Sequence, residues 1–181
     1  MNIRVTTPAD LSAVMSIIEE ARHSIAALGI NQWQNGTPNR AMITRDMAEG
    51  QGRVVTLDGE IIGTFAILYG GEPTYAVIEK GAWQIPDRDA SGDWSYIALH
   101  RVAVSLSHRG SGVSTAIIEY AESFARILGK RSLRIDTHEG NTVMRRMLEK
   151  HGFVPCGIIH LENGDPRVAY EKIVLKRKKT C

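Results

Sequence analysis

The sequence has little cysteine and little net charge. Its 181 residues include two cysteines, Cys156 and Cys181, without CxxC or CxxH spacing. Neither a disulfide scaffold nor a zinc site is therefore indicated, and we expect two free thiols and no metal. The 22 Lys and Arg residues nearly balance the 20 Asp and Glu residues, giving a formal net charge of +2. This balance argues against a general nucleic-acid binder.

Long apolar runs are also missing. No segment approaches the roughly 18 apolar residues that a membrane-spanning helix needs. The N-terminus has acidic and polar residues where a signal peptide would be apolar, so we expect a cytoplasmic protein with no membrane partner. A chain of 181 residues that is 43% hydrophobic can bury one full core, whereas two domains would each be marginal. We predict one domain over residues 1–175 and a solvated basic tail at 176–181.

The first half of the chain combines two strands in a hairpin with helices. A short strand at 3–5 precedes Thr7-Pro8, which predicts a helix start, and apolar residues recur at helical spacing as far as Leu28. A second short helix is predicted at 38–47. Strands at 53–57 and 61–69 flank Asp58-Gly59, a two-residue turn that accepts positive φ and so predicts a β-hairpin.

The second half continues the alternation after a long loop at 70–95. A strand is expected at 96–104, a helix from Val113 to Leu128, a strand at 133–136 and a short helix at 141–151. Two antiparallel strands at 153–161 and 167–175 complete the chain. Alternating strands and helices with hairpins at both ends predict an α/β fold, in which a mixed sheet is covered by helices on both faces.

A glycine-containing loop stands where the strand at 96–104 gives way to the next helix. Its sequence is Arg109-Gly110-Ser111-Gly112-Val113-Ser114. Glycines let the backbone approach a ligand closely, and a helix N-terminus carries about half a positive charge, so a phosphate group suits this position. The motif lacks the lysine of a P-loop and the third glycine of a dinucleotide fingerprint. By itself it is equally compatible with a tight strand-to-helix connection.

Three motifs in order make the sequence resemble the GNAT superfamily of acyl-CoA N-acyltransferases. The family signature Arg/Gln-x-x-Gly-x-Gly/Ala is matched by Arg109, Gly112 and Ser114, with serine as a small departure at the last position. The strand at 99–104 and the segment from Asn141 to Phe153 also match. The resemblance spans nearly the whole chain.

The resemblance implies a three-layer α/β/α fold with a central mixed, largely antiparallel sheet, and acyl-CoA between the fourth and fifth strands. Backbone groups near Val102, Ala103 and Val104 would bind the pantetheine arm. The amides of Arg109, Gly110, Ser111, Gly112, Val113 and Ser114 would bind the pyrophosphate. Asn141 would contact the cofactor from the other side, and an N-cap for the following helix is the equally supported alternative.

The family reaction is direct attack of an amine on the thioester, which requires loss of a proton from an ammonium ion. His100 is our candidate base because an ordinary imidazole titrates near pH 6.5. A histidine hydrogen-bonded within the sheet is the alternative. Glu79 and Asp93 are further candidates, acting through water.

Many relatives use a tyrosine to protonate the departing thiolate, but Leu148 occupies the corresponding position. Tyr170 is our candidate replacement. A CoA thiol, with a pKa near that of cysteine at about 8.5, is also a tolerable leaving group without an acid. Cys156 has no evident base partner, so we do not expect it to carry the acyl group.

Acceptor choice is assigned to residues of two loops. These are Gln32, Trp33 and Gln34 in the first loop and Tyr75, Trp83 and Trp94 in the second. Packing of the loops onto the core is the alternative for each aromatic residue. The segment Asp136-Thr137-His138-Glu139, just past the fifth strand, is a further candidate for contact with acceptor or cofactor.

We therefore predict an acetyl-CoA-dependent N-acetyltransferase that acts on a small-molecule or peptide amine. The possibility of a homodimer is left open. A non-catalytic acyl-CoA-binding or regulatory module is the main alternative, motivated by Leu148. A nucleic-acid-binding protein that uses the basic tail at 176–179 is a third class, which the near-neutral charge disfavours.

Overall fold

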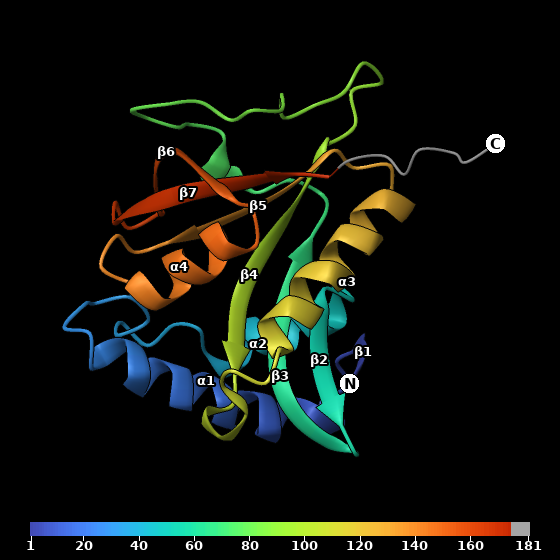
Figure 1. The fold of residues 1–181 in the computed structure, drawn as a ribbon, viewed down its shortest axis with the longest axis vertical. Coiled ribbons are helices and arrows are strands. Elements are labelled where there is room, and N and C mark those ends of the chain that lie inside the picture. Colours follow the sequence, from blue (N-terminus) through green and yellow to red (C-terminus); the bar gives the residue numbers. More distant parts are fainter. Residues whose placement is uncertain (175–181) are drawn as a thin grey trace. The chain divides into compact units, whose positions relative to one another are not determined.

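The structure, a computed structural model, describes residues 1–174 (Figure 1). It forms two compact units. Unit 1 contains Met1–Ile67 and Leu99–Ile118, and unit 2 contains Leu68–Ala98 and Glu119–Cys181. Neither unit is a continuous stretch of chain, so a single domain over 1–175 stays a prediction. Leu175, the predicted tail at 176–181 and Cys181 lie outside the described residues.

Seven strands are hydrogen-bonded in the order β1-β2-β3-β4-β5-β7-β6. β4 and β5 are parallel, whereas β1–β2, β2–β3, β5–β7 and β6–β7 are antiparallel. The predicted mixed sheet with flanking helices is thus confirmed. The strands are β1 (Asn2–Val5), β2 (Gly52–Leu57), β3 (Glu60–Leu68), β4 (Tyr96–Val104), β5 (Ser132–Thr137), β6 (Val154–His160) and β7 (Pro166–Ile173).

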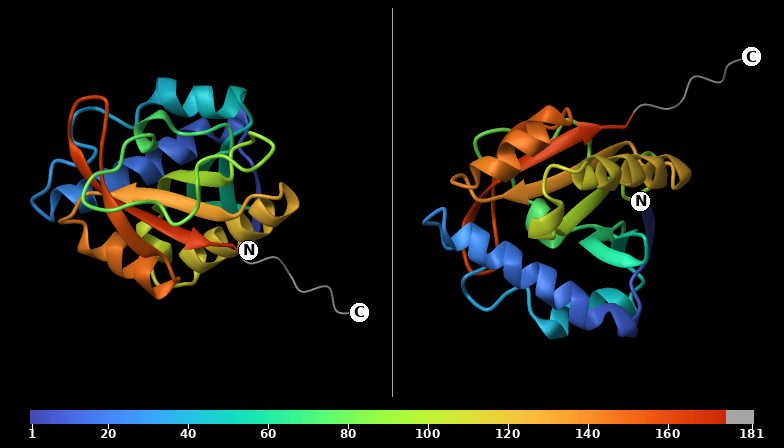
Figure 2. Two further views of the ribbon diagram at one scale, coloured as in Figure 1. Left: turned by 90° about the horizontal axis from the view of Figure 1, so that it is seen from above. Right: turned by 60° about the horizontal axis from the view of Figure 1, so that its bottom comes forward.

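Unit 1 has helices on both faces of its strands. Val54 packs with α1 (Leu11–Ala26) and α2 (Arg40–Ala48), and Figure 2 shows α1 running alongside β2 and β3. The next residue, Val55, faces the other way because side chains alternate along a strand. It is paired with Gly63, and a Cβ at Gly63 would lie 2.9 Å from Val113 at the start of α3 (Val113–Ile127).

Unit 2 has a helix on one face of its strands and the long loop on the other. Tyr170 and Glu171 are neighbours in β7, so their side chains point to opposite faces. The Tyr170 hydroxyl accepts a hydrogen bond from Arg145 of α4 (Thr142–Lys150). The Glu171 carboxylate accepts one from the amide of Gln84 in the loop, which crosses β5 and β7 in the left view of Figure 2.

Three predicted details are refined by local geometry. The predicted helix after Thr7 begins as a 3-10 turn, Pro8–Asp10, where the Asp10 carboxylate accepts the Thr7 amide at 2.7 Å. α2 starts at Arg40 because the Asn39 side chain caps it. The predicted turn at Asp58-Gly59 is confirmed, with φ of +50° and +87°. Short 3-10 turns also occur at Pro73–Tyr75 and Leu106–His108.

None of the helices found in residues 1–174 is both long enough and apolar enough to cross a bilayer.

Candidate active site

The glycine loop lies in unit 1, directly before α3. Gly110 and Gly112 have φ of +78° and +87°, values that glycine adopts without steric cost. A Cβ at either position would meet no atom within 4 Å, so the space beside both glycines is open. Arg109 and Ser111 are exposed, whereas Val113 is buried. Backbone amides at the start of a long helix and open space beside the glycines fit an anionic group.

Polar contacts within unit 1 hold the segment that leads into the glycine loop. The Glu20 carboxylate of α1 accepts the Leu106 amide at 2.8 Å. The hydroxyl of Ser111 donates to the His108 carbonyl at 2.6 Å, and Ser107 bonds the His108 ring at 2.9 Å. These contacts hold the backbone on both sides of Arg109.

His100, the predicted base, lies in the middle of β4, four residues before the strand ends at Val104. His100 is partly buried, and its Nε2 atom is hidden from solvent. Val102 and Val104 are also partly buried, whereas Ala103 belongs to a core cluster with Ile17 and Ala21 of α1. β4 pairs with β5 at Tyr96–Ala98 and continues for six more residues. The segment that carries His100 and the predicted pantetheine contacts is therefore the part beyond this ladder.

Trp33 packs against a cluster in unit 1 that is formed by Ile17 and Ala21 of α1 and Ala103 of β4. Its φ is +64°, which is unusual for a bulky residue. Arg22 holds this conformation by donating from Nε to the Trp33 carbonyl at 3.0 Å and from Nη2 to the Pro38 carbonyl at 2.7 Å. Of its neighbours, Gln32 is buried and Gln34 is exposed.

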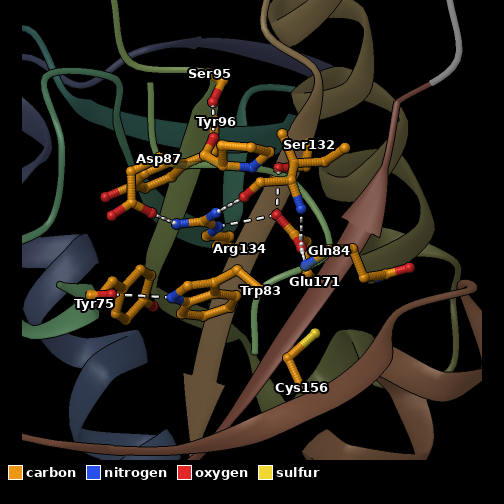
Figure 3. A network of polar contacts seen from close by, with 12 residues as sticks. Tyr75, Trp83, Gln84, Asp87, Ser95, Tyr96, Ser132, Arg134, Cys156 and Glu171 are labelled. Carbon is orange, nitrogen blue, oxygen red and sulfur yellow. Dashed lines mark hydrogen bonds and ion pairs between the residues drawn. The ribbon is translucent and has the colours of Figure 1, made fainter. Parts of the chain in front are cut away.

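Arg134 of β5 lies between two aromatic rings in unit 2, that of Trp83 from the long loop and that of Tyr96 from β4 (Figure 3). Arg134 is completely buried between the rings of Trp83 and Tyr96, with its guanidinium carbon 4.2 and 4.0 Å from their centroids. Its Nε donates to Glu171, also completely buried, at 2.9 Å. Its Nη1 donates to Asp87 at 2.5 Å. The cluster therefore anchors the loop to β5 and β7.

These contacts bear on the prediction that aromatic residues of the long loop bind the acceptor. The Trp83 indole donates to the Tyr75 carbonyl at 2.9 Å, and its ring lies 5.2 Å from that of Tyr75. Tyr75 is completely buried, so its ring is part of the core and not of a surface that contacts a ligand. Trp94 is partly buried and stacks under Arg88 at 4.0 Å. For Trp83 and Trp94, contact with the acceptor stays a prediction.

The end of β5 carries the segment that sequence reasoning marked as a further candidate. The Tyr75 hydroxyl donates to Asp136 at 2.8 Å. Burial, together with the Asp136 charge, raises the pKa of Tyr75 far above its ordinary value, so this hydroxyl stays protonated. Thr137 is buried, His138 is partly buried and accepts the Gly140 amide at 3.0 Å, and Glu139 is exposed.

Tyr170 and Asn141 both contact α4 in unit 2. The buried Tyr170 hydroxyl accepts from Arg145 at 2.9 Å and donates to Glu149 at 3.3 Å. The Asn141 side chain caps α4 by accepting the Met144 amide at 3.1 Å. Both contacts are structural, and the acid role of Tyr170 and the cofactor role of Asn141 stay predictions. Leu148, at the position of the family tyrosine, is completely buried.

Cys156 is a buried free thiol in β6. Burial raises its pKa, which keeps the sulfur protonated and weakly nucleophilic at neutral pH. Of the two carboxylates named as further bases, Glu79 is exposed, with its backbone bridged to Ile158 of β6. Asp93 is exposed and donates its amide to Asp89.

Sequence reasoning missed a buried ion pair next to His100. Arg101 donates two hydrogen bonds of 2.7 Å to Asp46 of α2. One signal was present, because Asp46 follows Ile43 by three residues and so falls on the apolar side of a short amphipathic helix. Nothing in the local pattern of β4 marks Arg101 as its partner.

Comparisons with known proteins agree with this architecture. The family model "Acetyltransferase (GNAT) family" matches residues 18–153. A GNAT-family acetyltransferase from Streptococcus agalactiae is 35% identical with a TM-score of 0.82, over 97% of this chain and 96% of that one. A comparison with curated proteins finds no match.

Two more distant structures share the fold. A GNAT-family acetyltransferase from Listeria monocytogenes is 20% identical with a TM-score of 0.69, over 95% of this chain and 94% of that one. The ribosomal-protein-S18-alanine N-acetyltransferase of Escherichia coli is 12% identical with a TM-score of 0.64, over 99% of this chain and 97% of that one. Given the family match and the Streptococcus agalactiae relative, this chain belongs to the GNAT acetyltransferase family.

Proposed function

We propose that this protein transfers an acetyl group from acetyl-CoA to a primary amine of a small-molecule or peptide acceptor. The observation that carries the proposal is the open glycine loop at 109–114, which leads into α3 in a chain of the GNAT family. The family uses acyl-CoA as its co-substrate, and acetyl-CoA is the donor that we assign.

The loop suits a pyrophosphate for electrostatic reasons. Amides at the start of α3 carry partial positive charge, and Arg109 is an exposed cation beside them. The left-handed glycines keep Cβ atoms away from the backbone that the phosphates would approach. We assign the pantetheine arm to the backbone of Val102, Ala103 and Val104, because β4 extends past its ladder with β5 there.

The chemistry requires a neutral amine beside the thioester. An alkyl ammonium has a pKa near 10, so a base must accept its proton, and we assign this step to His100 on β4. The amine nitrogen then attacks the thioester carbon, the carbon–sulfur bond breaks, CoA leaves as a thiolate, and the protonated amide nitrogen releases its second proton to solvent. Protonation of the thiolate is assigned to Tyr170 or to solvent. Attack is direct in a ternary complex, since Cys156 is buried and protonated.

Trp33 is the acceptor-binding candidate with the best structural support. It packs against the cluster that contains Ala103, in the same unit as His100, and its strained backbone is held by Arg22. Strained residues of this kind persist only where surrounding contacts hold them, and they concentrate at functional sites. The acceptor is expected to be a small molecule or a peptide. We expect no nucleic acid, membrane or metal to be required.

Calorimetric titration of acetyl-CoA into matched glycine variants tests the binding assignment. Gly112→Ala and Gly129→Ala both place a Cβ on a left-handed residue with open space around it, but Gly129 is at the other end of α3. Gly112→Ala should weaken binding about tenfold, and Gly112→Glu more strongly, because its carboxylate repels the phosphates. Gly129→Ala should leave the affinity unchanged. Equal affinities in folded Gly112 variants would reject the assignment.

Turnover is tested by release of free CoA thiol across a panel of amino acids, polyamines, aminoglycosides and peptides. Thiol release that depends on the amine supports the transferase. Tight binding of acetyl-CoA without turnover of any amine would instead favour the non-catalytic acyl-CoA-binding module, for which Leu148 in place of the tyrosine is the motivating observation.

A further inference from the structure

Arg101 has a left-handed backbone in the interior of β4, with φ of +54°. Strand residues normally have φ near −120°, and a long side chain at positive φ costs free energy. Asp58 also has positive φ, but it lies in a two-residue turn where this conformation is normal. The strand therefore contains a local distortion that its own sequence does not favour.

A buried ion pair accompanies this distortion. Arg101 Nε donates to Asp46 Oδ2 and Nη2 donates to Oδ1, both at 2.7 Å. The two side chains are only 14% and 9% exposed. Two parallel charge-assisted hydrogen bonds fix both the position and the orientation of a guanidinium group. Because Asp46 belongs to α2, the pair ties the distorted residue to an element outside β4.

Arg101, the left-handed residue, lies between two residues to which we assign roles in the reaction. His100 directly precedes Arg101, and Val102 directly follows it. Burial raises the pKa of Asp46, and the charge and hydrogen bonds of Arg101 act in the opposite direction.

We propose that the Asp46–Arg101 ion pair holds β4 in the left-handed conformation that aims His100 and the Val102 backbone for acyl transfer. Both members are positioning residues, and the proposal rests on the proposed function. Without the pair, a residue other than glycine at position 101 returns to extended backbone. Such a change in a strand redirects the side chains that follow or precede it.

Unit 1 provides a matched control pair. Arg4 donates two hydrogen bonds to Asp10, at 2.7 and 2.8 Å, and the Asp10 side chain is also 9% exposed. This pair joins β1 to the turn before α1. Arg4 is not among the residues with positive φ. A variant without the Arg4–Asp10 pair therefore loses a similar ion pair, but neither residue of that pair has positive φ.

Two double variants test the proposal directly. Asp46→Asn/Arg101→Gly and Asp46→Asn/Arg101→Ala both remove the ion pair without leaving a buried charge. They differ in that glycine adopts positive φ freely and alanine does not. The readouts are kcat, the KM for acetyl-CoA and for the acceptor, and the backbone chemical shifts of residues 100–102, each expressed as its deviation from the random-coil shift of the residue type present, all at a temperature where both variants are folded.

We expect the glycine variant to keep kcat within about threefold of wild type and the alanine variant to lose tenfold or more in kcat, with a raised KM for acetyl-CoA because the Val102 backbone is displaced. Asp10→Asn should lower the melting temperature and leave kcat and the chemical shifts as in wild type. Equal kcat in the two double variants, at any level, would overturn the proposal.

The chemical shifts separate this proposal from the proposed function. If the wild-type protein acetylates no amine, the proposed function fails. The claim that the ion pair holds residue 101 in the left-handed conformation then stands only if the shifts of residues 100–102 are native in the glycine variant and altered in the alanine variant. Native shifts in both variants would show that the ion pair does not hold the distortion.

Discussion

The guanidinium of Arg134 lies over the indole of Trp83, 4.2 Å from the ring centroid, in the anchor of the long loop. The other face of the guanidinium meets Tyr96, and the charge is paired with Glu171 and Asp87. Removal of the indole would therefore uncover a buried cation.

Trp83→Ala should lower the free energy of unfolding by about 3 kcal/mol, because a packed indole and a cation–π contact are lost together. Thermal and urea unfolding measure this change. Trp83→Phe keeps an aromatic face and should lose less than half as much. An unchanged melting temperature in Trp83→Ala would contradict the anchor. A raised acceptor KM in Trp83→Phe would show that the indole contacts the acceptor as well.

Asp10→Asn should destabilise the protein in a pH-dependent way. Hydrogen bonds from Arg4, and then from Thr7, hold the pKa of Asp10 well below its ordinary value near 4. The stabilisation is therefore fully present above pH 5 and is lost as pH falls through the lowered pKa. We expect a difference of about 1–2 kcal/mol at pH 7 that shrinks steadily between pH 4 and pH 2. Urea unfolding at several pH values measures it, and a difference that does not vary with pH would contradict the assignment.

His100→Ala should lower kcat roughly a hundredfold and leave the KM for acetyl-CoA nearly unchanged. The acidic limb of the pH–rate profile should disappear with it, because the group that must be deprotonated is gone. His100→Gln, which retains a polar side chain, should behave in the same way. Full activity with an unaltered profile would return His100 to a structural role in β4.

Cys156→Ser should remain active, since direct attack needs no thiol. The raised pKa of the buried thiol keeps it protonated at neutral pH. Mass spectrometry of the wild-type protein after incubation with acetyl-CoA alone should show no added acetyl group. An acetylated Cys156, together with an inactive serine variant, would establish a covalent intermediate instead.

Two asparagine caps separate helix capping from cofactor binding. Asn141 caps α4 and Asn39 caps α2 through the same side-chain contact. Alanine at either position should cost about 1 kcal/mol. Asn141→Asp keeps an oxygen for the cap, but its charge should raise the KM for acetyl-CoA about tenfold if CoA phosphates lie nearby. Asn39→Asp should leave this KM unchanged. The same KM in Asn141→Asp and wild type would limit Asn141 to capping.

Local sequence determined the helices and strands, and also the strand-to-helix junction that contains the glycine loop. The turn at Asp58-Gly59, the strand Tyr96–Val104 and the glycine loop before Val113 could all be predicted from residues close together in the chain. Glycine adopts the positive φ seen at Gly110 and Gly112 without steric cost, so the residue type itself permits this loop. The family resemblance came from three motifs in order, which are the strand at 99–104, the loop residues Arg109, Gly112 and Ser114, and the segment from Asn141 to Phe153.

Only tertiary structure determined which partners the side chains and strained residues of these elements contact. Arg134 lies in a strand that was predicted from its apolar neighbours, and its burial requires Glu171 of β7, the Trp83 ring from the loop and the Tyr96 ring from β4. The left-handed conformations of Trp33 and Arg101 oppose their local preference and are accompanied by contacts from Arg22 and Asp46. Arg22 lies 11 residues before Trp33 and Asp46 lies 55 residues before Arg101. Periodicity, which compares the hydrophobicity of near neighbours within one element, carries no information about either contact.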